Sequence, residues 1–151
     1  MALRNIVKST DELLRKTSKE ITIFDDKLKE LAADLLDTVR IKNGLGLAAP
    51  QIGVLKRIVV VDKADKDFLV LVNPKIIKES NETWVSEEAC LSVENKSGPV
   101  RRPKKIIVKA QDLDGNPFTF KASKMFARIC MHEMDHLDGI LFIDKIEVSQ
   151  R

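Results

Sequence analysis

The sequence predicts an α+β fold in which antiparallel strands pack around one buried helix in the second half of the chain. Three observations predict it. Apolar residues recur with helical spacing between residues 25 and 43, strand-like runs joined by polar turns fill much of residues 57–122, and a second helical run occupies residues 123–139. We expect a single domain over residues 1–151, because this length suits one hydrophobic core and no repeat or linker divides it.

The composition is typical of a soluble globular protein, with 44% hydrophobic and 32% charged residues. The net charge is only +3, and the basic residues are scattered with few aromatic residues between them, so no direct nucleic-acid binding is indicated. No apolar run approaches bilayer length, and the first sixteen residues lack the apolar core of a secretory signal. We therefore expect a cytoplasmic protein with no membrane contact.

The first long helix is predicted to begin at Asp25-Asp26 and to end at Asn43-Gly44, after a short helical turn at residues 11–16. Four apolar residues recur at spacings of three, four and four, which indicates one face packed on a core: Leu28, Leu31, Leu35 and Val39. The charged residues of this segment are expected on a solvated face: Lys27, Lys29, Glu30, Asp34 and Asp37.

Small residues fill the segment that follows, residues 44–53. Its glycines and alanines leave little side-chain bulk, so another backbone could approach closely and an extended peptide could pair there as an added strand. The alternative is a helix end followed by a plain loop. For this segment taken alone we favour the loop, because small-residue loops are common.

Strand-like patterns then occur at residues 58–61, 68–72, 75–78, 105–111 and 118–122. Asn73-Pro74 predicts a break between two of these strands, and Asp114-Gly115-Asn116 predicts a hairpin turn. Residues 140–146 are expected to form a last strand.

The helix predicted at residues 123–139 has Ser123 as N-cap and Asp138-Gly139 as its end. It contains the pattern HExxH, with His132 and His136 four residues apart and therefore on one helical face. Two imidazoles so placed can bind one metal ion, and Glu133 between them suits a general base. These are the only two histidines of the chain, and four apolar neighbours predict that the helix is buried: Phe126, Ile129, Cys130 and Leu137.

A catalytic metal site of this kind needs a third protein ligand and an open position. The pattern HExxHxxGxxH would place a histidine at position 142, where the chain has Phe142, and Glu147 is the only glutamate after the helix. We therefore expect the third ligand upstream, with Cys90 as the best candidate because its neighbours are small and apolar. The alternative is that Cys90 is a core cysteine. We interpret Cys130 as a core cysteine, and we expect both thiols to be free.

Three stretches taken together resemble the peptide deformylase family, which carries GxGLAAxQ, EGCLS and HExDH in this order. Here they read GLGLAAPQ at residues 44–51, EACLS at 88–92 and HEMDH at 132–136. The sequences NPKII and QDLDGNPF also look like this family, so the resemblance covers nearly the whole chain. It implies a metal-dependent hydrolase that removes the N-formyl group from the N-terminal formyl-methionine of newly made proteins and releases formate.

The resemblance implies three metal ligands: Cys90, His132 and His136. It also implies Glu133 as general acid and base, and the side-chain amide of Gln51 with the backbone N–H of Leu91 as donors to the oxyanion. The ion would be a divalent metal, Fe(II) in the cell, with Zn(II), Ni(II) or Co(II) able to replace it. Glu88 and Arg102 would be coupled to each other beside the site.

Substrate contacts are expected from two places. The resemblance implies that Leu45 and Gly46 pair with the peptide backbone. The side chain of the first residue should lie against the ligand-bearing helix, because the formyl carbon must sit beside the metal, and Met125 and Ile129 are the apolar residues best placed there together with Leu45. The implied partners are N-formyl-methionyl peptides and nascent chains, with transient ribosome contact, and we expect a monomer.

The chain also departs from the family pattern. Ala89 replaces the usual glycine of EGCLS, and residues 93–99 lack the usual proline. Two alternative functions stay open. An HExxH endopeptidase would need a longer cleft and a third ligand that this chain does not offer. A metal-bound relative could hold formyl peptides, or only metal, without useful turnover, and Ala89 and the altered loop are the only hints of it. Formate release separates these alternatives from a deformylase.

Overall fold

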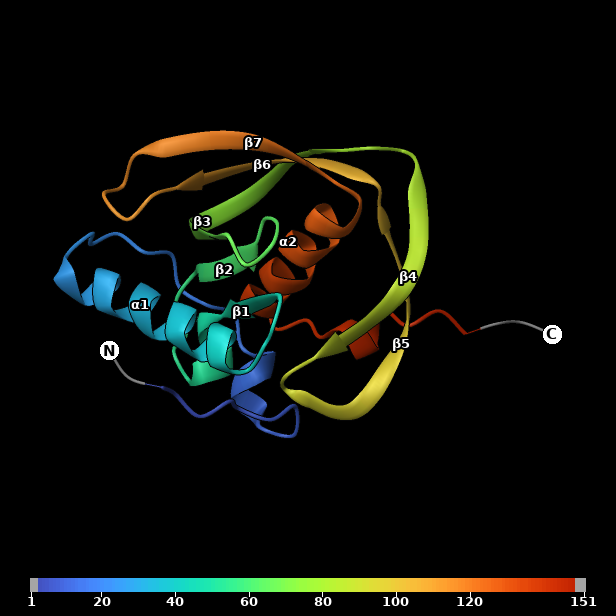
Figure 1. The fold of residues 1–151 in the computed structure, drawn as a ribbon, viewed down its shortest axis with the longest axis horizontal. Coiled ribbons are helices and arrows are strands. Elements are labelled where there is room, and N and C mark those ends of the chain that lie inside the picture. Colours follow the sequence, from blue (N-terminus) through green and yellow to red (C-terminus); the bar gives the residue numbers. More distant parts are fainter. Residues whose placement is uncertain (1–2, 149–151) are drawn as a thin grey trace.

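The computed structural model describes residues 3–148 and has an α+β architecture with two antiparallel sheets. The larger sheet has the order β1-β2-β3-β6-β7, and the smaller sheet pairs β4 with β5. Figure 1 shows helix α2 (Lys124–Leu137) in the middle of the molecule, below β6 and β7, with the ribbon of β4 and β5 curving around its side. Within residues 3–148 no helix is long and apolar enough to span a bilayer.

The five strands of the larger sheet are β1 (Gly46–Ala48), β2 (Ile58–Asp62), β3 (Phe68–Glu79), β6 (Lys105–Gln111) and β7 (Pro117–Ser123). Alternate residues of β6 and β7, such as Val108 and Ala122, point inward and join one core cluster with Ile129 and Leu137 of α2. The sheet therefore supports α2 from one side.

Helix α1 (Asp26–Ile41) begins where the sequence predicts, because the carboxylate of Asp25 accepts a hydrogen bond from the backbone N–H of Leu28. The predicted apolar face is buried. The expectation of a solvated Asp34 is wrong: this residue is only 3% exposed, and its carboxylate forms an ion pair with Arg4 at 2.9 Å. A buried carboxylate is tolerated here because a cation reaches it.

Strand β3 is continuous where the sequence predicts two strands separated by Asn73-Pro74. The pairing with β6 shifts register between Val72 and Lys75, and Asn73 has a φ of 50°. The side-chain amide of Asn73 accepts from the backbone N–H of Ile21 and donates to its carbonyl, each at 2.8 Å. The predicted break is therefore a β-bulge, and Asn73 uses it to hold the N-terminal segment against the sheet.

Two other segments also differ from expectation. The small-residue segment is not a plain loop, because it forms β1 and then the 3-10 helix Ala49–Ile52. The strand expected at residues 140–146 is absent from the described chain: Phe142–Asp144 form a 3-10 turn, and Ile146 makes only a single bridge to Val100. The carboxylate of Asp144 accepts from the backbone N–H of Leu141 at 3.0 Å, a local bond that favours this turn.

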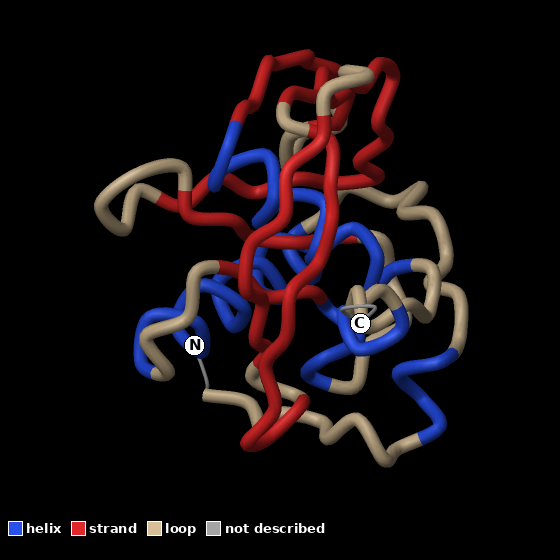
Figure 2. Tube along the Cα trace, turned by 90° about the vertical axis from the view of Figure 1, so that its right-hand side faces the viewer, coloured by secondary structure: helices blue, strands red, loops and turns tan. Residues whose placement is uncertain are grey.

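Strands β4 (Thr83–Cys90) and β5 (Val93–Pro103) were not predicted as strands. Polar residues are frequent in both segments and hide the strand pattern, and two charged residues, Glu88 and Arg102, are buried rather than exposed to solvent. In Figure 2, which faces the right-hand side of Figure 1, the two strands run as a long paired ribbon across the molecule. Cys90, the proposed ligand, is the last residue of β4.

Helix α2 has the predicted bounds, although Ser123 accepts no side-chain capping hydrogen bond from any residue within 3–148. Its end depends on Gly139, which has a φ of +73°. A Cβ atom at this position would lie 2.4 Å from the backbone oxygen of Arg15. Gly139 therefore allows both the left-handed turn and the close packing of the N-terminal segment on the end of α2.

We predict that Gly139→Ala lowers the free energy of unfolding by about 1–3 kcal/mol, because left-handed strain and a backbone clash act together. Gly53→Ala is the matched control, since Gly53 also has a positive φ of 86° but its Cβ would meet no atom closer than 4.0 Å. Urea unfolding of both variants tests this. Equal destabilisation would show that the contact with Arg15 costs nothing.

Candidate active site and metal centre

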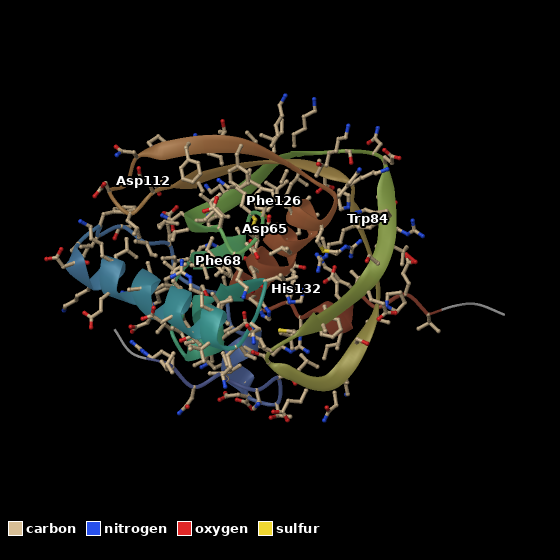
Figure 3. The ribbon with its side chains drawn as sticks, viewed as in Figure 1. Asp65, Phe68, Trp84, Asp112, Phe126 and His132 are labelled. Atoms are coloured by element: carbon tan, nitrogen blue, oxygen red, sulfur yellow. The ribbon has the colours of Figure 1, made fainter. Side chains whose placement is uncertain are left out.

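The two histidines of the HExxH pattern project from one face of α2 toward the end of β4. Both are buried, and their ring centroids lie 5.3 Å apart. The Sγ atom of Cys90 lies 3.4 Å from Nε2 of His136, and one ligand atom from each of Cys90, His132 and His136 lies within 4.8 Å of the other two. Figure 3 shows His132 in the interior of the molecule. A helix and a strand distant in sequence thus bring three possible metal ligands together.

These donors fit a divalent transition metal. A thiolate and two imidazoles are a ligand set found in catalytic zinc sites and suit iron as well. Nδ1 of His132 lies 2.9 Å from Oε1 of Glu88, and because an ionised carboxylate only accepts, this nitrogen carries the proton. The other nitrogen of His132 is then left with a lone pair for a metal, which is the usual arrangement of a ligating histidine.

The electrostatics of the cluster also favour a positive charge at its centre. Burial opposes protonation of His132, but hydrogen bonds with Cys90 and Glu88, together with the charge of Glu133, raise its pKa to about 10. For His136, burial and the positive charges of His132 and Arg102 lower the pKa to about 3, so this imidazole is neutral. The site thus favours one cation among its ligands, and neutral His136 can donate its lone pair to a metal.

Glu88 connects the ligands to the rest of the protein. Arg102 donates to both of its carboxylate oxygens, at 2.6 and 2.8 Å, and is itself only 2% exposed. Burial favours a neutral Glu88, but the hydrogen bonds from Arg102 and His132 outweigh it and hold the pKa of Glu88 well below its usual range. The predicted pair of Glu88 and Arg102 is therefore present as a buried, bidentate ion pair.

Sequence reasoning missed a second arginine, Arg128, which is also 2% exposed and donates to Oε2 of Glu88 at 2.5 Å. It missed Asp135 as well, whose carboxylate accepts from Arg102 at 2.9 Å. A signal for Arg128 was present, because this residue precedes His132 by four positions and therefore lies on the same helical face. A charged residue at such a position requires a buried partner.

Glu133 is buried beside the cluster, and its Oε1 atom has no hydrogen-bond partner among the described residues. Burial is the main reason that its pKa is raised to about 7. A Cβ atom on Gly46 would lie 2.7 Å from both Cγ and Oε2 of Glu133. The glycine in β1 thus allows the backbone of this strand to approach the carboxylate closely.

Gln51 is 1% exposed, and its side-chain amide is held on both sides. Its oxygen accepts from the backbone N–H of Ala48 at 3.0 Å, while Nε2 donates to Oγ of Ser92 at 3.2 Å and to Sγ of Cys90 at 3.4 Å. The N–H groups of Gln51 therefore point toward the cluster. Ser92, another residue that sequence reasoning missed, fixes this orientation.

These side chains surround a cavity of about 300 Å³ that opens between β1 and β4. Ten of the residues singled out from the sequence line it: Leu45, Gly46, Gln51, Glu88, Cys90, Leu91, Met125, Ile129, His132 and Glu133. His136 and Arg102 are not part of this lining, since both lie behind it. Leu45 and Met125 are exposed, whereas Ile129 is buried. Exposed Ala89 also lines the cavity, so its methyl group has room.

Comparison with known proteins gives one consistent result. Residues 3–151 match the family described as Polypeptide deformylase. The chain is 51% identical to the peptide deformylase of Caldicellulosiruptor bescii, over 100% of this chain and 94% of that protein, and 46% identical to that of Finegoldia magna, over 97% and 91%. It superposes on the crystal structure of peptide deformylase from Thermotoga maritima with a TM-score of 0.95 at 36% identity, covering 98% of this chain and 100% of that one. This chain therefore belongs to the peptide deformylase family.

Proposed function

We propose that this protein is a metal-dependent peptide deformylase, which hydrolyses the N-terminal formyl amide of formyl-methionyl peptides and nascent chains and releases formate. The observation that carries the proposal is the group of Cys90, His132 and His136 beside a buried carboxylate, Glu133, at the base of an open cavity. Membership of the family supports it further. We infer that the enzyme acts in the cytoplasm as a monomer and meets nascent chains in transient contact with the ribosome.

We infer that the peptide substrate binds as an extended strand along β1. This strand lies at the edge of the larger sheet, paired on one side with β2 only. Gly46 of this strand lines the cavity and, although it is buried, adds no side chain that would block pairing along the free edge. Main-chain pairing with Leu45 and Gly46 would place the formyl group beside Glu133 for nearly any sequence that follows methionine.

The metal would be held by Cys90, His132 and His136. When bound, a divalent ion acidifies water to a pKa of roughly 7 and polarises a carbonyl oxygen. By resemblance to the family we propose Fe(II) in the cell, with Zn(II), Ni(II) or Co(II) as substitutes. The soft Cys90 thiolate is compatible with each of these ions.

Glu133 would move the proton. Its unpaired Oε1 and its raised pKa, to about 7, suit a group that accepts a proton from the attacking water and then gives it to the leaving amine. The side-chain N–H of Gln51 and the backbone N–H of Leu91 would donate to the oxyanion as negative charge develops on the formyl oxygen. One such donor typically contributes about 3 kcal/mol to transition-state stabilisation.

The methionine side chain would lie against Met125, Ile129 and Leu45, which line the same cavity as His132. Flexible apolar side chains of this kind suit a thioether. Met125 and Ile129 lie on α2 within two turns of His132, so the formyl carbon and the first side chain can be placed at the same time.

The central test is formate release from formyl-Met-Ala-Ser by anaerobically prepared protein of known metal content. Formate release with no internal peptide cleavage is the expected result. Cleavage of internal peptide bonds would support the endopeptidase alternative. Formyl-peptide binding, or metal binding alone, without turnover would support a relative that is no longer an enzyme.

For the metal site, we predict that Cys90→Ser weakens metal binding by more than roughly 10–100-fold, the loss typical when a residue hydrogen-bonded to a ligand is removed. The reason is that a hydroxyl binds these metals much more weakly than a soft thiolate. The matched control is Cys130→Ala, since Cys130 is a fully buried free cysteine outside the ligand group. Metal content after dialysis against a chelator measures the difference. Retention of metal by Cys90→Ser would exclude Cys90 as a ligand.

For proton transfer, we predict that Glu133→Gln retains metal and loses about 10²–10⁴-fold in kcat, because the amide cannot accept the proton. Metal analysis and formate release are measured on the same preparation. A variant that binds metal normally and still releases formate at nearly the wild-type rate would assign the proton to another group.

For specificity, we predict that the wild type prefers formyl-Met to formyl-Ala peptides by about 2–3 kcal/mol in kcat/KM, the value of burying one large apolar group. Ile129→Phe should reduce this preference by filling the cavity, whereas Ile107→Phe, outside its lining, should leave it unchanged. An unchanged preference in Ile129→Phe would place the methionine pocket elsewhere.

A further inference from the structure

Arg128, which sequence reasoning missed, is a side chain of α2 that contacts both strands of the smaller sheet. Nη1 of Arg128 donates to the backbone oxygen of Val100 on β5 at 2.9 Å, and Nη2 donates to that of Trp84 on β4 at 3.0 Å. Its guanidinium carbon also lies 4.6 Å from the centre of the Trp84 ring. Figure 3 shows Trp84 beside β4. These contacts fix the position of the sheet relative to the helix.

The same guanidinium reaches the carboxylate that orients a metal ligand. Oε2 of Glu88 accepts from Arg128 at 2.5 Å, while Oε1 of Glu88 lies 2.9 Å from Nδ1 of His132. Arg128 and His132 are one helical turn apart, so both reach Glu88 from the same face of α2. Glu88 in turn is only two residues from Cys90 on β4. A shift of Glu88 would therefore disturb a ligand on each element.

Arg102 cannot replace Arg128 as the link between α2 and the smaller sheet. It belongs to β5 and so to the same sheet as Glu88, and its contact with α2 is made to the half-buried side chain of Asp135. Arg128 instead joins the helix to main-chain oxygens, which cannot rotate away as a side chain can. A planar guanidinium can satisfy a carboxylate, two carbonyls and a ring face together, which a lysine ammonium cannot do.

We propose that Arg128 is a positioning residue of the metal centre: it holds β4, and with it Cys90, at ligand distance from His132 and His136. The proposal rests on the metal-dependent function proposed above. It assigns no contact with substrate to the guanidinium. Its role is to fix the distance between β4 and α2, which meet at the site through side chains of the helix.

The test compares Arg128→Met and Arg128→Lys with Arg101→Met. Arg101 stands next to Arg102 on β5, but it is exposed and its ion pair is with Glu147. The readouts are Co(II) affinity by chelator competition, the thiolate-to-cobalt absorption band, thermal unfolding of the metal-free protein, and kcat and KM for a formyl-methionyl peptide. We expect Arg128→Met to bind Co(II) about 10–100-fold more weakly, with a diminished thiolate band. Its kcat should fall with little change in KM, and Arg101→Met should match the wild type.

Arg128→Lys keeps the charge and guards against a failure of Arg128→Met to fold. If Arg128→Lys unfolds at the same temperature as the wild type but binds Co(II) more weakly, the result would support the proposal. Wild-type affinity and an unchanged thiolate band in either folded variant would overturn it. Because Co(II) binding is measured independently of formate release, a wild-type protein that binds Co(II) through Cys90 but releases no formate would refute the proposed function and leave this inference standing.

Discussion

The structure depends on the docking of the smaller sheet against α2, and a buried charge network carries out that docking. Glu88 is the centre of the network, since it accepts hydrogen bonds from Arg102 and Arg128 and fixes the ring of His132. Removing one partner from such a buried pair typically costs about 3–5 kcal/mol, because a charge is then left without compensation. The proposed ligands lie on α2 and β4, so by our proposal the same docking also holds Cys90 near the histidines.

A second constraint acts on the opposite side of the cavity. In the proposed binding mode, the free edge of β1 comes close enough to Glu133 for a substrate strand to place its formyl amide beside the carboxylate. Gly46 allows that approach, because any side chain there would occupy the space of Glu133. The same carboxylate is shielded from water by the strand, which explains why burial raises its pKa to about 7. Packing and proton affinity are therefore set by one contact.

Sequence reasoning succeeded where the information is local. The spacing of His132 and His136, the apolar face of α1 and the hairpin turn at Gly115 are each encoded within a few residues. It failed where a distant partner decides the outcome. Glu88 on β4 and Arg102 on β5 face the protein interior because each has a buried partner of opposite charge there, so their polarity does not reveal their burial. The position of Arg128 on the face of His132 calls for a buried partner, but its spacing does not identify that partner as Glu88, forty positions earlier.

Charge balance joins the network to the metal centre. Within the network Arg102 and Arg128 compensate Glu88, and Arg102 and Lys145 compensate Asp135. Cys90 and Glu133 lie beside the two imidazoles, and a divalent ion bound there would favour the ionised form of both. The arginines therefore allow a buried, ionised carboxylate to accept a hydrogen bond from Nδ1 of His132.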